Sequence, residues 1–229
     1  MITLYQFATS PFCEKIRRAL QYKGLDYEVH NVPRAEVANY KHISPSGKFP
    51  AIEHDGKAVA DSTDVLRYLD EAFPIKPLIP ADAKNAAHAH IIEDWADESL
   101  YFYEMTMRIA WSHNNAAVIE EFVATMPGLT AEQARPLIEK GVNDLVNAQG
   151  LGRKPQAQVV ADCERHFMAL DALLNGSDWL VGDALSIADL SVISQLNALL
   201  YASEAREALS KTKNVAAWMT RVDAIAPKE

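Results

Sequence analysis

Residues 8–24 read ATSPFCEKIRRALQYKG, and this stretch decides how the N-terminal part of the chain folds. It follows a strand-like run, ITLYQF, at residues 2–7. Pro11 suits the first turn of a helix over residues 11–23, and Gly24 suits the residue after its end. Between them, apolar residues recur at spacings of three and four, which places them on one helix face. The pattern predicts a strand followed directly by an amphipathic helix.

Ser10 and Cys13 occupy the positions of a Cys-x-x-Cys motif in which a hydroxyl replaces the first thiol. Ser10 lies where the first N–H groups of the helix have no intrahelical partner and the helix dipole adds about half a positive charge. This place stabilises an anion, although Ser10 or Thr9 could equally be a helix cap. Cys13 could be a reactive thiol or a small buried residue, and a dithiol cycle is not available to it.

The rest of the first third alternates strand and helix patterns. A second strand is predicted within residues 26–32, and residues 49–60 predict a hairpin. Asp55 and Gly56 form a strong signal for a type I′ turn between its two strands. An amphipathic helix follows within residues 62–73. The order is strand, helix, strand, loop or short helix, two strands and helix.

The pattern changes after a segment with three prolines at residues 74–85, which is typical of a linker. From about residue 83 onward the chain has long helical patterns and no convincing strand. Breaks occur within residues 126–136 and 150–155. The predicted division is an N-terminal domain at residues 1–75, a linker at residues 76–84 and an all-helical domain at residues 85–229.

Two capping signals mark helices in this second part. Thr130 and Gln133 have the spacing of a capping box, and Ser186 and Asp189 form a variant of it with Asp in place of Glu. Pro136 argues against one continuous helix through its region, because proline lacks a backbone N–H.

Composition excludes several classes of function. The formal net charge of −9 argues against a nucleic-acid partner, which would need a basic patch. Cys13 and Cys163 are too few for a disulfide framework or a zinc site, and the histidines at 88 and 90 lie on different faces of a helix. The sequence shows no signal-peptide pattern and no membrane-spanning apolar run, so we expect a reduced, cytoplasmic protein without a membrane partner or a metal.

Two further segments could bind a ligand. Phe49 and Pro50 begin a predicted strand, and a cis bond between them would turn the N–H and C=O of Phe49 outward to pair with an extended peptide. Asp61 and Ser62 stand at the start of a second helix. The carboxylate suits an ammonium group, and the hydroxyl and free N–H groups suit a carboxylate, so together they suit an α-amino acid head group. A simple helix cap is the alternative.

These segments together resemble the cytosolic glutathione transferase family over nearly the whole chain. SPFCEKIRRAL at residues 10–20 is similar to the active-site turn of serine-type members, closest to the tau class and less so to the zeta class. GKFPAI at 47–52 resembles the cis-proline element of the family, and ADS at 60–62 resembles the pair of residues that holds the γ-glutamyl group. GDALSIADLSV at 182–192 resembles the capping box of the helical domain. The resemblance implies an α/β thioredoxin-like N-terminal domain and an all-α C-terminal domain.

The resemblance also implies roles for particular residues. Ser10 would be catalytic: its hydroxyl would donate a hydrogen bond to the sulfur of glutathione and favour the thiolate. The glycyl carboxylate would face Lys48, and the γ-glutamyl group would lie at Asp61 and Ser62. Asp61 is one methylene shorter than the usual Glu or Gln. The implied glutathione-binding residues are Lys48, Phe49, Pro50, Asp61 and Ser62.

The second substrate would bind between the first turn and the first long helix of the helical domain. Candidate residues for this electrophile pocket are Ala8, Phe12, Tyr101, Met105, Arg108 and Trp111. Aromatic residues and Met at helical spacing could equally belong to the core.

The function implied by the resemblance is a glutathione transferase that directs the thiolate of its co-substrate, glutathione, at a small hydrophobic electrophile or a peroxide. One alternative is a glutathione-dependent thiol reductase that uses Cys13 as a redox thiol. Another is a non-catalytic protein-binding module, in which residues 112–155 form a partner surface rather than a cover for the active site. The family also implies a homodimer.

Overall fold

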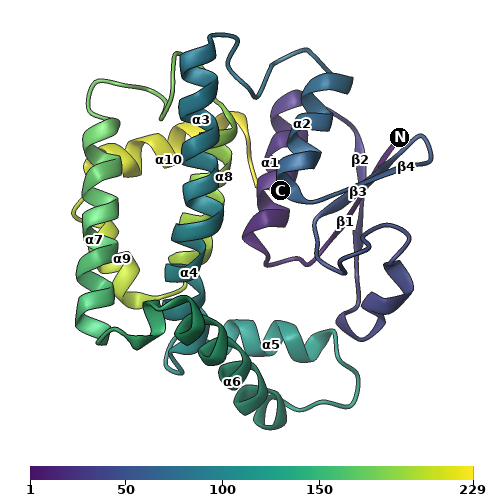
Figure 1. Cartoon of the computed structure of the whole chain (residues 1–229), viewed down its shortest axis with the longest axis vertical. Helices are drawn as coiled ribbons and strands as arrows, with labels where there is room; N and C mark the ends of the chain where they lie inside the picture. The colour runs from purple at the N-terminus through teal and green to yellow at the C-terminus, as the bar shows by residue number, and fades with distance from the viewer. Residues whose placement is uncertain (229) are drawn as a thin grey trace.

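The computed structural model describes residues 1–228. The N-terminal part is built on a four-stranded sheet in the order β2-β1-β3-β4 (Figure 1). β1 pairs in parallel with β2 and antiparallel with β3, and β3 pairs antiparallel with β4. The strands are β1 (Ile2–Gln6), β2 (Tyr27–Asn31), β3 (Ala51–His54) and β4 (Lys57–Ala60).

Two helices, α1 (Pro11–Lys23) and α2 (Ser62–Ala72), lie between this sheet and the helical part of the chain (Figure 1). Alternate residues of β1, Ile2 and Leu4, are buried in one core with the apolar face of α1. Gly24 ends α1 in a left-handed conformation, with φ at 68°. The strand and helix predicted from residues 2–24 are therefore confirmed.

The hairpin predicted at Asp55 and Gly56 is also confirmed. His54 pairs with Lys57, so the turn has two residues. Their φ angles, 50° and 76°, are both positive, as a type I′ turn requires.

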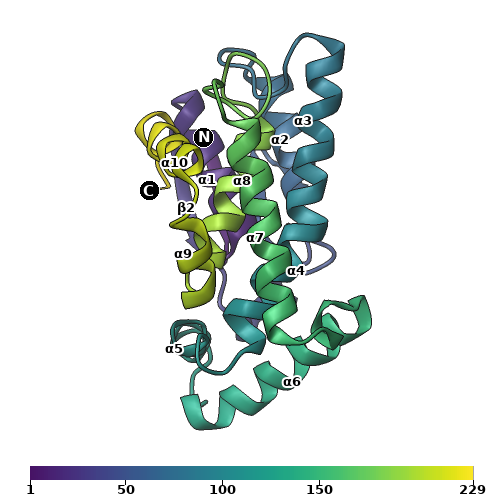
Figure 2. The same ribbon diagram turned by 90° about the vertical axis from the view of Figure 1, so that its left-hand side faces the viewer.

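The helical part begins with one long helix and contains no strand within residues 83–228 (Figure 2). Two π-helical stretches, Ala96–Leu100 and Met105–Ala110, continue the long helix on either side of α4. A 3-10 turn at Leu151–Arg153 follows α6, and another at Arg34–Tyr40 lies in the N-terminal part. The helices are α3 (Ala83–Trp95), α4 (Tyr101–Glu104), α5 (Ala116–Ala124), α6 (Ala131–Gln149), α7 (Gln156–Leu173), α8 (Ile187–Leu199), α9 (Ser203–Leu209) and α10 (Lys213–Ile225).

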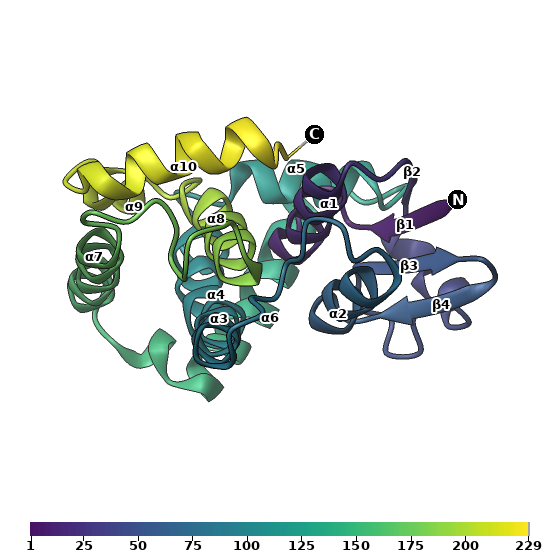
Figure 3. The ribbon, with the colours of Figure 1, turned by 90° about the horizontal axis from the view of Figure 1, so that it is seen from above.

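α8 is the central helix of this part, and it also contacts α1, α3 and α10 (Figure 3). The predicted capping box is present at its start, with Ser186 and Asp189 bonded to each other's backbone N–H groups. The carboxylate of Asp189 also accepts hydrogen bonds from the N–H of Leu180 at 3.0 Å and from the indole N–H of Trp218 at 2.8 Å. Asp189 thus connects three segments of the core.

The expected break at Pro136 is wrong. α6 continues through this residue, and the predicted capping box of Thr130 and Gln133 holds the start of the helix. Pro136 lies only six positions into α6 and is exposed, so its missing N–H removes one hydrogen bond near the start of the helix.

Cys13 and Cys163 are both free and buried. Within residues 1–228, no helix has the length and apolar character needed to cross a membrane.

Candidate active site

A cavity of about 1030 Å³ lies between the N-terminal and helical parts of the chain. One wall consists of the turn before α1, the segment at residues 45–50 and the start of α2. The opposite wall is the long helix at residues 93–109, and α5 and α6 add Val118 and Leu145. The cavity therefore collects side chains from both parts of the molecule.

Ser10 lies in the wall of this cavity at the N-terminus of α1. Its backbone is extended, and its carbonyl accepts hydrogen bonds from Cys13 and Glu14 at 3.1 and 3.0 Å. The side chain makes no helix-capping hydrogen bond. The hydroxyl is thus available for another partner at a position with a positive electrostatic potential.

The segment at Phe49 and Pro50 contains a cis peptide bond. The Ser44 hydroxyl holds this segment by donating a hydrogen bond to the carbonyl of Lys48 at 2.6 Å. Within residues 1–228, the N–H and C=O of Phe49 form no hydrogen bond. These two groups and the exposed Lys48 side chain border the same cavity as Ser10.

Asp61 and Ser62 also line the cavity, at the N-terminus of α2. Asp61 has a positive φ of 81°, and its carboxylate caps the helix by accepting a hydrogen bond from the N–H of Thr63 at 2.9 Å. Ser62 is buried beside it. The capping alternative is therefore realised for Asp61, which still has a second carboxylate oxygen.

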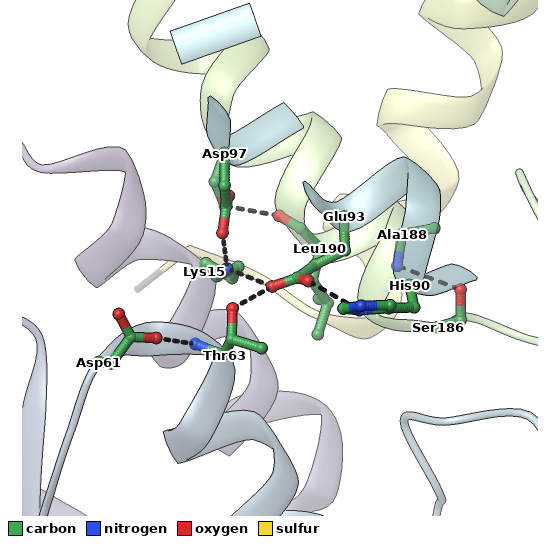
Figure 4. Close-up of polar contacts among 10 residues, drawn as sticks. Lys15, Asp61, Thr63, His90, Glu93, Asp97, Ser186, Ala188 and Leu190 are labelled. Atoms are coloured by element: carbon green, nitrogen blue, oxygen red, sulfur yellow. Dashed lines mark hydrogen bonds and ion pairs between the residues drawn. The ribbon is translucent and has the colours of Figure 1, made fainter. Parts of the chain in front are cut away.

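A buried group of charges, which sequence reasoning missed, adjoins this end of the cavity (Figure 4). The Lys15 ammonium lies 3.0 Å from Glu93 and 2.5 Å from Asp97, and the hydroxyl of Thr63 donates a hydrogen bond to Glu93 at 2.5 Å. We call Lys15, Thr63, Glu93 and Asp97 the Lys15 cluster. The cluster joins α1 and α2 to the long helix. In the sequence, the i, i+4 spacing of Glu93 and Asp97 indicates only that the two acids share one helix face.

The acids of the Lys15 cluster differ in their pKa. Burial raises the pKa of Asp97 from 3.8 to about 6, although the Lys15 ammonium opposes this shift. Burial also acts on Glu93, but Lys15 and the Thr63 hydroxyl outweigh it and lower the pKa of that group. One oxygen of Asp97, Oδ1, is buried and has no hydrogen-bond partner. With both acids ionised, the cluster carries one excess negative charge.

Four of the six residues expected around an electrophile line the cavity: Phe12, Tyr101, Met105 and Arg108. The rings of Phe12 and Tyr101 lie 5.1 Å apart. The other two, Ala8 and Trp111, are not in its lining: Ala8 is exposed, and Trp111 packs in the hydrophobic core. The alternative of a core position is therefore realised for Trp111.

Cys13 is enclosed rather than exposed to the cavity. It packs against Val32, Ile43 and Phe49 in a small apolar cluster. Burial raises the pKa of its thiol to about 11, although the Phe7 backbone and the Ser10 hydroxyl oppose the shift. A protonated, enclosed thiol does not suit a redox role.

α5 covers the turn that carries Ser10. Glu121 on α5 accepts hydrogen bonds from both the N–H and the hydroxyl of Thr9. Arg34, which follows β2, contacts the ring of Phe122 on the same helix. Part of residues 112–155 therefore lies over the cavity, as one of the two expected roles for this segment requires.

Two family models match the chain. The one described as "Glutathione S-transferase, N-terminal domain" matches residues 4–77, and the one described as "Glutathione S-transferase, C-terminal domain" matches residues 153–227. The chain belongs to the glutathione S-transferase family. These matches confirm the family resemblance and the fold class predicted from the sequence motifs.

Relatives of this glutathione S-transferase include LigF from Sphingobium sp., which is 26% identical over 97% of this chain and 90% of its own. A probable maleylacetoacetate isomerase from Caenorhabditis elegans is 29% identical over 82% of this chain and 74% of its own. The crystal structure of LigF, described as a beta-etherase, matches with a TM-score of 0.71 and 25% identity over 99% of this chain and 97% of that chain.

A solved glutathione S-transferase from Methylobacillus flagellatus with glutathione bound has a TM-score of 0.66 and 21% identity, over 100% of this chain and 97% of that chain. This likeness shows the shared fold. Within residues 1–228 of the present transferase, no group of three or more His, Cys, Asp or Glu side chains could hold a metal ion.

Proposed function

We propose that this protein is a glutathione transferase that ionises the thiol of glutathione at Ser10 and directs it at a small electrophile or a peroxide. The observation that carries the proposal is that one cavity brings together Ser10, the unpaired backbone of Phe49 and the start of α2 at Asp61 and Ser62. These groups match the successive parts of one extended tripeptide.

Glutathione would lie across the N-terminal wall of the cavity. The free N–H and C=O of Phe49 would pair with the cysteinyl residue as in a β-ladder. The exposed Lys48 would face the glycyl carboxylate. At the other end, Ser62 and the first N–H groups of α2 would receive the γ-glutamyl carboxylate.

The γ-glutamyl ammonium would lie at the acidic side of the cavity. The Asp61 carboxylate keeps one oxygen that is not used in capping Thr63. The excess negative charge of the Lys15 cluster adds an attractive potential there, because Thr63 of that cluster follows Ser62 directly.

The chemical step would begin with transfer of the thiol proton to solvent water. The Ser10 hydroxyl would donate a hydrogen bond to the sulfur, and the N-terminus of α1 would stabilise the same negative charge. Lowering a thiol pKa from about 9 by about two units leaves much of it ionised at neutral pH, and each unit corresponds to about 1.4 kcal/mol. The thiolate then forms the new bond to the electrophile while the leaving group departs with its electron pair.

Calorimetric titration of glutathione into the wild-type protein and into Ser62→Ala tests the site. We expect saturable binding in the wild type and about tenfold weaker binding in the variant, because Ser62 loses a hydrogen bond to a charged group. Ser177→Ala, an exposed serine far along the chain, is the matched control and should bind like wild type.

Equal binding by all three proteins would mean that Ser62 does not contact glutathione. Absence of binding at millimolar glutathione in the wild type would overturn the enzymatic proposal and favour a protein-binding module of the same fold.

A further inference from the structure

Arg34 is a cavity residue that the proposed chemistry leaves without a role. It begins the short helix Arg34–Tyr40 after β2 and lines the cavity. Its guanidinium carbon lies 4.3 Å from the ring centroid of Phe7 and 5.3 Å from that of Phe122. Phe7 in turn packs edge-on against Phe49, at 5.3 Å between ring centroids. Arg34 is thus fixed beside the Ser10 and Phe49 wall by one aromatic ring from each part of the chain.

The guanidinium of Arg34 is unpaired in the part of the chain that the structure describes. Within residues 1–228 it forms no hydrogen bond and no ion pair. Glu121, the acid whose charge acts on Arg34, directs both carboxylate oxygens at Thr9 instead. Burial lowers the pKa of Arg34, and the charge of Glu121 only opposes this effect. The five N–H donors therefore remain for a ligand.

The other two cations of the cavity differ from Arg34. Arg108 donates a hydrogen bond to Glu104 at 2.9 Å, so its charge is already paired. Lys48 is exposed and faces the position proposed for the glycyl carboxylate. The γ-glutamyl carboxylate is proposed to lie at Ser62. Both carboxylates of glutathione would then be bound without Arg34.

We infer that Arg34 binds a carboxylate on the second substrate, so the preferred electrophiles are small unsaturated or aromatic acids. A planar guanidinium held through its aromatic contacts presents its N–H edge, which matches a carboxylate in a bidentate manner. Phe7, Phe12 and Tyr101 supply apolar surface for the remainder of such a molecule. This inference rests on the proposed function.

A matched pair of electrophiles tests the inference by kinetics: 2-chloro-1,3-dinitrobenzene and its carboxylate analogue 4-chloro-3,5-dinitrobenzoate. We expect Arg34→Gln to lower kcat/KM for the carboxylate about 10- to 100-fold, mainly through KM, and to change the neutral compound less than about threefold. Arg34→Lys should retain part of the preference. Arg67→Gln, which removes an exposed arginine of α2, is the charge-matched control and should leave both unchanged.

Equal losses of kcat/KM for both compounds, with a pH profile displaced to higher pH, would overturn the inference. They would mean that Arg34 stabilises the thiolate of glutathione instead. Unchanged kinetics for both would overturn it as well.

Binding of the unreactive pair, 3,5-dinitrobenzoate and 1,3-dinitrobenzene, tests Arg34 without any chemistry. We expect the wild type to bind the benzoate about tenfold more tightly and Arg34→Gln to lose this preference. Wild-type protein without a preference would overturn the inference. Because this assay contains no glutathione, a failure of the proposed transferase function would be seen separately, in the calorimetric titration.

Discussion

Ser10 is placed to contact a ligand in the cavity. It stands at the start of α1, lines the cavity and forms no capping hydrogen bond. Its neighbour Cys13 is buried in an apolar cluster, with burial raising its thiol pKa to about 11. The Ser10 side chain therefore borders the cavity, whereas the Cys13 thiol is enclosed in the apolar cluster.

Substituting Ser10 should change the ionisation of bound glutathione more than its affinity. In Ser10→Ala we expect the pKa of the bound thiol to rise by about one to two units, which lowers kcat/KM at neutral pH about 10- to 100-fold. Activity should recover as the pH is raised, because the thiolate then forms without the hydroxyl. Ultraviolet difference titration of the bound thiolate gives the pKa, and turnover at neutral pH that matches wild type would exclude the proposed role of Ser10.

Sequence reasoning proposed Ser10, Phe49 and Ser62 because each stands in a local pattern, a turn or a helix start. It did not propose Arg34 or Lys15. Neither residue belongs to a local motif. Arg34 contacts Phe122, and Lys15 forms an ion pair with Glu93, and both partners are distant in the sequence. Local patterns can therefore indicate the backbone half of the site, while the charges that complete it depend on how distant helices pack.

At the scale of elements, α5 is held over the site by few polar contacts. Glu121 bonds to Thr9, and Phe122 touches Arg34. Ile119 is the buried apolar residue of this helix. An element with so little buried surface is expected to open more readily than the core helices.

Removing the Glu121 contact should loosen α5 selectively. In Glu121→Ala we expect the amides of residues 116–124 to exchange hydrogen about fivefold faster, the factor that corresponds to about 1 kcal/mol, while α8 stays unchanged. Glu120→Ala on the same helix is the control, because Glu120 is exposed. Equal exchange in the two variants would show that apolar packing alone holds α5.

The predictions for elements succeeded where a signal lay within one turn or one helix, as at the Asp55–Gly56 hairpin and the capping boxes. They failed at Pro136, because the rule against proline in helices does not weigh how close the residue lies to the helix start. The path of α5 over the cavity was left open, since an amphipathic pattern does not state which neighbour a helix covers.

At the scale of the whole molecule, the Lys15 cluster joins the two parts of the chain. Lys15 and Thr63 come from the N-terminal part, and Glu93 and Asp97 come from the long helix. Arg18 adds a second link, donating a hydrogen bond to the carbonyl of Ala226 at 2.6 Å. Two buried polar links across one interface favour unfolding of both parts together.

The Lys15 cluster should make stability depend on pH. Because the folded state raises the pKa of Asp97 from 3.8 to about 6, it binds the proton more tightly than the unfolded state, and stability falls as pH rises through this window. Glu93 shifts in the opposite direction, so its contribution changes only at lower pH. His90 lies 3.6 Å from Glu93. This residue and the other histidines are unchanged in the variant Asp97→Asn, so they are the same in the two proteins compared.

In Asp97→Asn we therefore expect a larger gain in unfolding free energy at pH 7.5 than at pH 5.0, with a difference of about 1–2 kcal/mol. Urea denaturation at the two pH values measures it. A difference of zero would mean that Asp97 does not carry an elevated pKa in the folded protein.

The cavity also has a consequence for how this scaffold could be re-engineered. The residues matched by the family models, 4–77 and 153–227, include Ser10, Phe49 and Ser62, whereas α5 and most of the wall opposite them lie between the two matches. The wall proposed to bind glutathione thus comes from a matched segment, whereas the helices that face and cover it lie between the two matches. A chimera that exchanges residues 112–150 between relatives should therefore change how the cavity is covered, while Ser10, Arg34 and the aromatic wall of the recipient stay in place.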